Sequence, residues 1–147
     1  MNPTIEMSVA ICTRNRHADL KKCIESISKQ NNIGSDLIEI IIVDDGDTNS
    51  EWLQKAENLL NQNNMELRYF RKEGSEAGLI KSRIKSIEIS KYENLLFLDD
   101  DVELEQDYFS ILKKTLADFP DAVGISGADQ GFVCTPKGRL IMLLSGR

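Results

Sequence analysis

Short runs of apolar residues alternate along the chain with segments in which apolar residues recur at helical spacing. Residues 8–12 and 95–98 form two such runs and predict buried strands, and 37–43 contains the β-branched run 40–43. A strand that is apolar on both faces is typical of the centre of a parallel sheet covered by helices on both sides. Residues 65–70 are more polar, which favours a shorter strand near an edge of the sheet.

Four helices are expected between and after these strands, from apolar residues spaced three or four positions apart. The first covers 18–30, the second begins near its N-cap Ser50, and the fourth covers 107–119 and ends before Pro120. The residues that mark the apolar faces of the four helices are, in chain order, Leu20, Cys23, Ile24 and Ile27; Leu53, Ala56, Leu59 and Leu60; Ile80, Ile84 and Ile87; and Tyr108, Leu112, Leu116 and Phe119.

Signals are weaker near the C-terminus. Residues 122–126 are predicted to form a further strand, and 132–134 and 140–144 to form strands around the turn 135–138. Strands that alternate with helices predict an α/β fold: an open, mostly parallel sheet with helices on both faces and right-handed connections. No repeat, linker or low-complexity tract interrupts the pattern. We therefore expect a single domain over residues 1–147. The apolar run 140–144 has no obvious cover, which is consistent with a core strand truncated at the C-terminus.

The composition is that of an ordinary soluble globular protein, with 41% hydrophobic and 29% charged residues. Its formal net charge of −6 argues against electrostatic binding to nucleic acid or to an anionic membrane. The longest apolar run, 140–144, is too short to span a bilayer, and the first residues show no secretory signal. Three cysteines without a C-x-x-C pair favour a reducing cytoplasm over a disulfide framework or a thiolate zinc site.

Polar residues follow three of the predicted strands, and parallel strands would bring these residues to one edge of the sheet. Two of the groups are acidic: Asp44, Asp45 and Asp47, and the triplet 99–101. A divalent cation explains such mutually repelling carboxylates, because Mg²⁺ and Mn²⁺ prefer hard oxygen ligands, phosphate and water. The alternative is that these residues form solvated turns, in which Asp and Gly are common.

Basic side chains near the same edge, Arg14, Arg16, Lys81 and Arg83, could face a diphosphate. The loop 74–78 would add backbone N–H groups at the start of a helix, where anions bind. The alternative for Lys81 and Arg83 is the solvated side of an amphipathic helix, which composition alone favours.

Four segments resemble, in order, the motifs of family 2 glycosyltransferases, which have the GT-A fold. Residues 9–16 (VAICTRNR) resemble the family's first strand and loop, and 41–46 (IIVDDG) its second-strand signature. Residues 78–83 (GLIKSR) resemble a Gly-rich helix entry, and 97–102 (FLDDDV) resemble the Asp-x-Asp motif. Each motif is weak alone, but four in the right order are far more specific. The resemblance covers residues 8–119.

The resemblance implies the nucleotide-sugar-binding part of a metal-dependent, inverting glycosyltransferase. Such an enzyme transfers a sugar from a nucleotide-diphospho-sugar donor to a hydroxyl of a glycan or lipid-linked acceptor in glycan or polysaccharide synthesis. By position, Asp101 with Asp99 would bind Mn²⁺ or Mg²⁺. The residues implied for nucleotide binding are Thr13, Arg14, Asn15, Asp44, Asp45, Arg83, Asp99 and Asp100. The resemblance also implies a cytoplasmic protein with peripheral association at the inner face of a membrane.

The chain departs from the family pattern at several positions. Cys12 stands where Pro is common, Asp47 where Ser is common, and Ile84 where Asn is common. The departure at Ile84 puts in doubt a polar contact near the nucleotide that the family pattern implies. The family's catalytic base lies well after the Asp-x-Asp motif, and the nearest carboxylate here, Asp129, carries no recognisable base motif. We identify no catalytic base. The sequence therefore predicts either a fragment of a longer enzyme or a shortened relative that binds donor without efficient transfer.

Two other functions stay open from the sequence. The first is a non-catalytic nucleotide-binding or scaffolding module, which the missing base motif favours. The second is a receiver-type phosphoacceptor domain, in which an Asp pair and an acceptor Asp also lie at strand ends. Receiver domains carry the pair after the first strand and a Lys after the last. Here the pair follows the second predicted strand, and no matching Lys is found.

Overall fold

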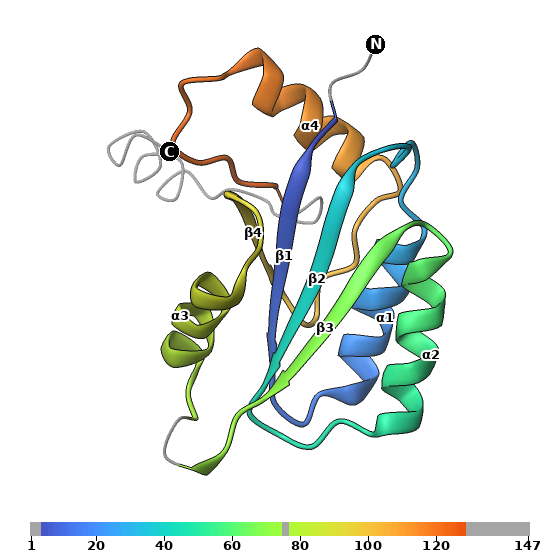
Figure 1. Ribbon diagram of the computed structural model, residues 1–147, viewed down its shortest axis with the longest axis vertical. Helices are drawn as coiled ribbons and strands as arrows, with labels where there is room; N and C mark the ends of the chain where they lie inside the picture. The colour runs from blue at the N-terminus through green and yellow to red at the C-terminus, as the bar shows by residue number, and fades with distance from the viewer. Residues whose placement is uncertain (1–3, 75–76, 129–147) are drawn as a thin grey trace, which may run out of the picture.

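The computed structural model describes residues 4–74 and 77–128 (Figure 1). From β1 to α4, strands and helices alternate along the chain as predicted, and wherever the sequence predicted an end of one of these elements, it differs from the observed end by at most two residues. The elements are β1 Glu6–Thr13, α1 His17–Ser28, β2 Leu37–Asp44, α2 Ser50–Asn61, β3 Met65–Arg71, α3 Leu79–Ile89, β4 Asn94–Asp99 and α4 Tyr108–Asp118.

The four strands form one parallel sheet in the order β3-β2-β1-β4. The register places Thr13 opposite Asp44 and Cys12 opposite Asp99. The carboxyl ends of β1, β2 and β4 therefore lie at the same edge of the sheet. This confirms that the polar segments after these strands come together, as their sequence pattern predicts.

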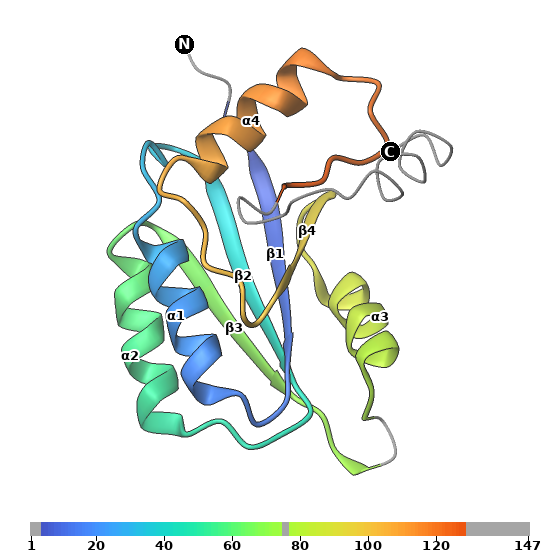
Figure 2. The ribbon, with the colours of Figure 1, turned by 180° about the vertical axis from the view of Figure 1, so that it is seen from behind.

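One face of the sheet is apolar and is covered by α1 and α2, which lie side by side in Figure 2. Ile24 of α1 is 1% exposed, and it packs in a core that includes Ile11 of β1 and Ile40 of β2. The side chains of α1 that enter this core are Leu20, Cys23, Ile24 and Ile27. These are the residues that the helical spacing predicted, and α2 adds Ala56 and Leu60.

The other face of the sheet carries α3, which turns small polar side chains toward the strands. Ser82 and Ser86 are the buried residues of α3. Ile80, Ile84 and Ile87 mark one face of the helix as predicted, but this face is exposed in the described part of the chain, and Ile80 is 76% exposed. Apolar periodicity thus identified the helix, but these isoleucines do not contribute to the described core.

Three further expectations are corrected. The strand 95–98 was predicted to be buried, but β4 is the outer strand among those described, and Phe97 is 40% exposed. Residues 122–126 contain no strand and are mostly exposed. Phe119 is 62% exposed, and Phe109 instead is the buried aromatic residue of α4. The strands predicted at 132–134 and 140–144 lie outside the described residues.

α4 lies near the starts of the strands, at the opposite end of the sheet from the carboxyl edge (Figure 1). Its Lys113 forms an ion pair with Asp36, with 2.7 Å between Nζ and Oδ2, and the other carboxylate oxygen of Asp36 accepts a hydrogen bond from the Ile5 N–H. Gln30 accepts a hydrogen bond from the Phe109 N–H. These contacts hold α4 at the end of the sheet opposite the carboxyl edge. None of the helices in the described ranges is long and apolar enough to cross a bilayer.

Candidate functional site

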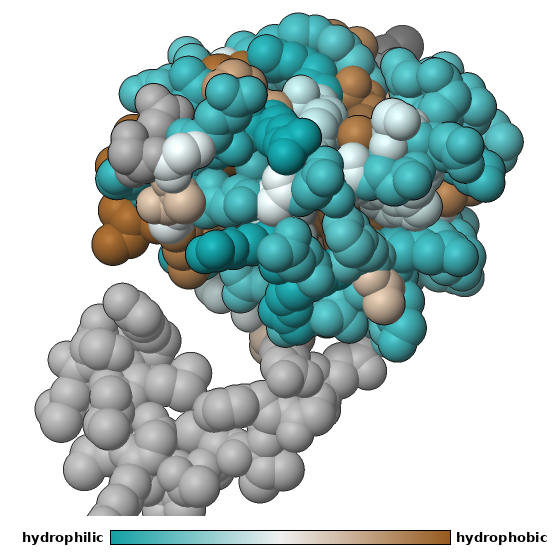
Figure 3. Space-filling view, turned by 90° about the horizontal axis from the view of Figure 1, so that it is seen from below, coloured by the Kyte–Doolittle hydropathy of each residue, from teal (hydrophilic) through white to brown (hydrophobic). Residues whose placement is uncertain are grey.

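A cavity of about 410 Å³ lies at the carboxyl edge of the sheet. Figure 3 views the molecule from this end, and the surface there is mostly hydrophilic. The cavity has two walls, one from β1, the start of α1 and the turn after β4, and one from the end of β2 and the start of α3. Its lining residues are Cys12, Thr13, Arg14, Arg16, Asp45, Gly78, Leu79, Ser82, Asp99, Asp100 and Asp101.

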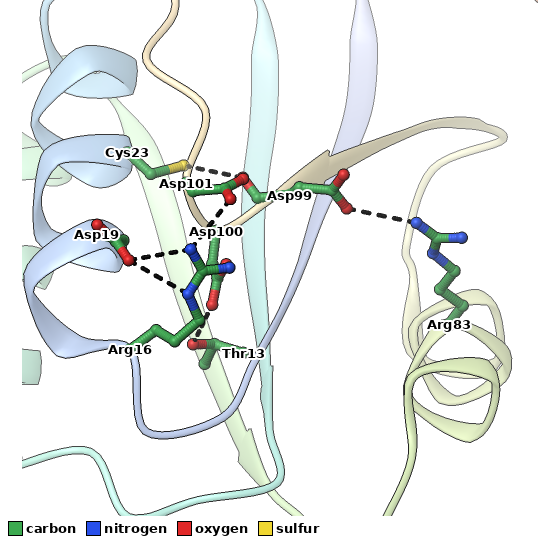
Figure 4. Close-up of polar contacts among 8 residues, drawn as sticks. All are labelled: Thr13, Arg16, Asp19, Cys23, Arg83, Asp99, Asp100 and Asp101. Atoms are coloured by element: carbon green, nitrogen blue, oxygen red, sulfur yellow. Dashed lines mark hydrogen bonds and ion pairs between the residues drawn. The ribbon is translucent and has the colours of Figure 1, made fainter.

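The first wall is organised by Arg16, whose guanidinium lies among carboxylates (Figure 4). Its Nη1 is 3.0 Å from Oδ1 of Asp100, and its Nη2 is 3.0 Å from Oδ2 of Asp101. Asp19 of α1 also pairs with it at 3.1 Å. The hydrogen bond to Asp101 and the nearby charge of Asp100 raise the pKa of Arg16. The Thr13 hydroxyl donates to Oδ2 of the buried Asp100 at 2.7 Å, which fixes the turn after β4 against β1.

Asp99 points the other way, toward α3 (Figure 4). Its Oδ1 accepts a hydrogen bond from Nη2 of Arg83 at 3.3 Å, and the Arg83 guanidinium lies 5.8 Å from the centre of the Phe97 ring. The side chains of Asp99 and Arg83 are both substantially exposed. Arg83 is therefore placed beside the cavity, although it does not line it.

The second wall contains an ion pair between Asp45 and Lys72, with 3.0 Å between Oδ1 and Nζ. Both side chains are nearly buried, at 7% and 2% exposure. The Gly78 N–H donates to Oδ2 of Asp45 at 2.6 Å, and the Ser82 hydroxyl donates to Oδ1 at 3.2 Å. Burial alone would raise the pKa of Asp45, but the hydrogen bonds from Gly78, Lys72 and Ser82 outweigh it and lower the pKa. Asp45 is thus an ionised acceptor at the cavity wall.

Asp44 shapes the loop after β2. Its carboxylate accepts hydrogen bonds from the Gly46 and Thr48 N–H groups at 2.7 and 3.0 Å, and from the Tyr69 hydroxyl at 2.8 Å. It is fully buried and does not line the cavity. Gly46 is required next to it, because a Cβ at this position would lie 2.3 Å from the Asn15 side chain.

Two cysteines lie at or near the cavity, Cys12 partly buried and Cys23 buried. Burial raises the pKa of Cys23 to about 12, and its Sγ lies 3.8 Å from the Asp99 carbonyl oxygen. Burial also raises the pKa of Cys12, so both are thiols near neutral pH. The structure offers neither as a ready nucleophile.

The carboxylates of the turn after β4 diverge, so among residues 4–74 and 77–128 no group of three or more His, Cys, Asp or Glu could hold a metal by itself. A Mg²⁺ or Mn²⁺ ion bound with a diphosphate needs only one or two carboxylates, because phosphate oxygens and water complete its shell. Asp101 is half-exposed at the cavity and Asp99 is exposed beside it. The donor chemistry at this edge therefore fits such an ion.

The cavity brings together most of the residues singled out from the sequence. Thr13, Arg14, Asp45 and residues 99–101 line it. Asn15 and Asp44 do not line it, and Asn15 instead packs against Gly46 in the left-handed conformation, at φ 56°. The sequence did not indicate Lys72, because a Lys after an edge strand carries no signal of burial.

This parallel sheet, with a polar cavity where the carboxyl ends of its strands meet, is an α/β fold of the GT-A type, as its structural neighbours show. The chain belongs to glycosyl transferase family 2, whose family model matches residues 8–142. A curated relative, the uncharacterized glycosyltransferase MG060 of Mycoplasma genitalium, is 34% identical over 118 residues. That match covers 78% of this chain and 36% of the relative.

Solved structures show the same fold. Residues 1–349 of TarS from S. aureus in complex with UDP give a TM-score of 0.67 at 21% identity, covering 85% of this chain and 38% of that one. The mannosyltransferase PcManGT from Pyrobaculum calidifontis in complex with GDP-Man and Mn²⁺ gives 0.58 at 17% identity, covering 76% and 32%. The chain thus spans about a third of the length of these relatives.

The strand order also decides one of the open alternatives. Receiver domains have the doubly wound order 2-1-3-4-5, whereas the described strands follow 3-2-1-4. Together with the family match, this order excludes the receiver reading.

Proposed function

We propose that this chain supplies the donor-binding part of a metal-dependent, inverting glycosyltransferase. The observation that carries the proposal is that Asp45 and Asp101, which come from the ends of different strands, line one cavity. A nucleotide-diphospho-sugar spans this cavity, with its nucleoside at the wall of Asp45 and its diphosphate toward the turn after β4. The acceptor is a hydroxyl of a glycan or lipid-linked saccharide.

Each wall of the cavity has a distinct task. Thr13, Arg14 and Asp45 contact the nucleoside, with Asp45 as a hydrogen-bond acceptor for the base. Asp100, tied to Thr13, holds the turn after β4, whose Asp99 and Asp101 line the cavity on the side of the diphosphate. Asn15 and Asp44 act indirectly, because they shape the two loops that flank the nucleoside. Arg83, at the side of Asp99, adds positive charge near the nucleotide.

Charge balance supports the need for a divalent cation. Four carboxylates line the cavity, and the only other charged side chains among its lining residues are Arg14 and Arg16. A diphosphate adds further negative charge, which nearby Arg and Lys residues offset only in part. Asp101 and Asp99 would hold Mg²⁺ or Mn²⁺, which supplies stabilisation of the negative charge that develops on the leaving diphosphate.

The structural neighbours support this proposal by what they bind. TarS was solved with UDP, and PcManGT with GDP-Man and Mn²⁺. The described residues present no carboxylate that we assign as the base for the acceptor hydroxyl. Transfer by the whole enzyme therefore needs a base outside the residues named here.

Calorimetric titration with UDP, dTDP, GDP and ADP, each with and without Mn²⁺, tests the proposal. We expect at least one nucleoside diphosphate to bind, and Mn²⁺ to tighten it. Asp101→Asn should abolish the effect of Mn²⁺. Asp47→Asn is the matched control, because Asp47 is exposed, pairs with Arg71 and lies outside the cavity.

Absence of metal-assisted binding for all four nucleotides would overturn the proposal. A donor-hydrolysis assay on the same protein separates transferase from binding module. Turnover of a bound nucleotide sugar, with release of its sugar, would exclude the non-catalytic module.

A further inference from the structure

Lys72 occupies an unusual place for a lysine. It follows the edge strand β3, yet its side chain is 2% exposed beneath the second wall of the cavity. Its Nζ contacts Oδ1 of Asp45 at 3.0 Å and Oγ of Ser82 at 2.9 Å. A third contact joins Nζ to the Gly78 carbonyl oxygen at 3.4 Å. Lys72 thus bridges the end of β2 to the first turn of α3.

A buried ion pair of this kind is weak evidence for stability, because desolvation of two charges offsets much of their attraction. An apolar pair of similar volume would pack the same space at least as well. The position of the pair suggests another task, since Asp45 reaches the cavity and Lys72 does not.

Asp45 has acceptor capacity left for a ligand. An ionised carboxylate offers about four acceptor positions. Among the described residues, Oδ1 accepts from Lys72 and Ser82, and Oδ2 accepts only from the Gly78 N–H. The remaining acceptor position belongs to Oδ2, on a residue that lines the cavity. Gly78, Lys72 and Ser82 together hold the carboxylate in place and favour its charged form, and Lys72 is the one of the three that carries a positive charge.

We infer that Lys72 is a positioning residue that sets the nucleobase preference of this cavity by holding Asp45 as an ionised acceptor. The inference rests on the proposed function. A fixed acceptor favours a base whose ring edge carries an N–H donor, such as uracil, thymine or guanine. At that ring position it disfavours cytosine and adenine, because their N3 and N1 nitrogens are acceptors. Without Lys72, Asp45 turns or takes up a proton, and a protonated carboxyl group can donate to a ring nitrogen.

The test compares the affinities of UDP and CDP, both with Mn²⁺, in wild type and four variants. The wild type should prefer UDP by about tenfold or more, the effect of mismatching one buried hydrogen bond. Lys72→Met should reduce this preference to about threefold or less, and Lys72→Arg, which retains the charge, should restore most of it. Lys55→Met, on the exposed surface of α2, is the control and should match wild type.

The fourth variant guards against misfolding. Lys72→Met leaves Asp45 buried without its partner, so the double variant Lys72→Met/Asp45→Asn removes both charges together. We expect it to melt closer to wild type than Lys72→Met does, and to show little preference, because an amide both donates and accepts. Because Asp45→Asn changes the acceptor itself, the double variant reports on stability, and the role of Lys72 is judged from the preferences of Lys72→Met and Lys72→Arg.

An unchanged ratio of UDP to CDP affinity in folded Lys72→Met or in the double variant would overturn the inference and leave the proposed function standing. A wild type that binds UDP and CDP equally would also overturn it. A wild type that binds no nucleoside diphosphate would refute the proposed function itself, and the inference with it.

Discussion

The two faces of the sheet are built by different physical means. On the face covered by α1 and α2, Ile11 and Ile40 pack against Ile24 in a continuous apolar core. On the face of α3, polar pairs cross the same strands: Ser8 with Glu39 and Arg68 with Glu39. The apolar face supplies most of the hydrophobic stabilisation, because burial of apolar surface is the main favourable term in folding.

α3 is held by specific polar contacts more than by apolar packing. Ser82 hydrogen-bonds Asp45, the Arg68 guanidinium donates to the Ile89 carbonyl oxygen at 2.7 Å, and Lys85 lies over the Phe70 ring. Its isoleucines remain exposed, and the hydrophobic atoms at the left margin of Figure 3 lie on the side where Figure 1 places α3. The cavity lies at the carboxyl edge, where both faces of the sheet end. Its first wall includes the start of α1, from one face, and its second wall includes the start of α3, from the other.

The largest expected effect tests whether the α1 face carries the stability. Ile24→Ala should lower the free energy of unfolding by about 2–5 kcal/mol, because it leaves a cavity in a fully packed core. Ile87→Ala, on the exposed side of α3, should change it by about 0.5 kcal/mol or less. Denaturant unfolding of both variants gives the comparison. Equal losses would show that the exposed isoleucines are also packed in solution.

The next effect concerns the polar network of the α3 face. Glu39 is fully buried and accepts hydrogen bonds from the Ser8 hydroxyl at 2.5 Å, the Lys91 N–H at 2.6 Å and Arg68 at 2.8 Å. Burial alone would raise the pKa of Glu39, but these hydrogen bonds outweigh it and lower the pKa. Glu39→Gln should lower the free energy of unfolding by about 1–3 kcal/mol at pH 7, since an amide cannot accept from donors on both sides.

Glu39→Gln should also change how the free energy of unfolding depends on pH. Because the pKa of Glu39 is lower in the folded state, its stabilisation is fully present above the unfolded pKa of about 4.3 and is lost as pH falls through the folded pKa. Unfolding free energies measured from pH 7 down to pH 3 should therefore fall less steeply in Glu39→Gln than in wild type. Glu88→Gln, an exposed partner of Lys85, is the control. Parallel curves for wild type and Glu39→Gln would contradict the assignment.

The smallest effect concerns the wall built on the α1 side. Arg16 places its positive charge between Asp100 and Asp101. Arg16→Gln should therefore tighten the binding of Mn²⁺ in the absence of nucleotide by about threefold to tenfold. The reason is that the guanidinium of Arg16 no longer competes with Mn²⁺ for these carboxylates. Electron paramagnetic resonance of free Mn²⁺ measures this directly. Arg14→Gln is matched to it, since Arg14 lines the same cavity and forms no ion pair within the described ranges. Weaker Mn²⁺ binding in Arg16→Gln would show that Arg16 organises the acidic turn instead.

The sequence predicted the apolar face better than the polar one. Leu20, Ile24 and Ile27 were found from their spacing, because a helix that packs on a sheet must repeat its apolar residues with the helical period. Ile80 and Ile84 repeat in the same way but are exposed, because periodicity shows that a helix has an apolar side and not what covers it. Ser82 and Ser86 face the sheet instead, and small polar residues leave no apolar pattern to detect.

The candidate site divides in the same way. Asp45 and residues 99–101 could be placed at one edge, because the ends of parallel strands must meet there. The separate tasks of Asp44 and Asp45 could not be predicted, since neighbouring residues at a strand end point to opposite sides of the sheet. Lys72 was missed because nothing in a local pattern distinguishes a buried lysine from a solvated one.

By itself, the sequence determined the order of strands and helices, the apolar side of α1 and the family motifs, because these depend on residues close together along the chain. The tertiary structure decided which carboxylate pairs with which basic side chain: Asp45 with Lys72, Asp100 with Arg16 and Asp99 with Arg83. These pairs join segments far apart in the chain. Their energies depend on separation and burial, which are properties of the folded arrangement alone.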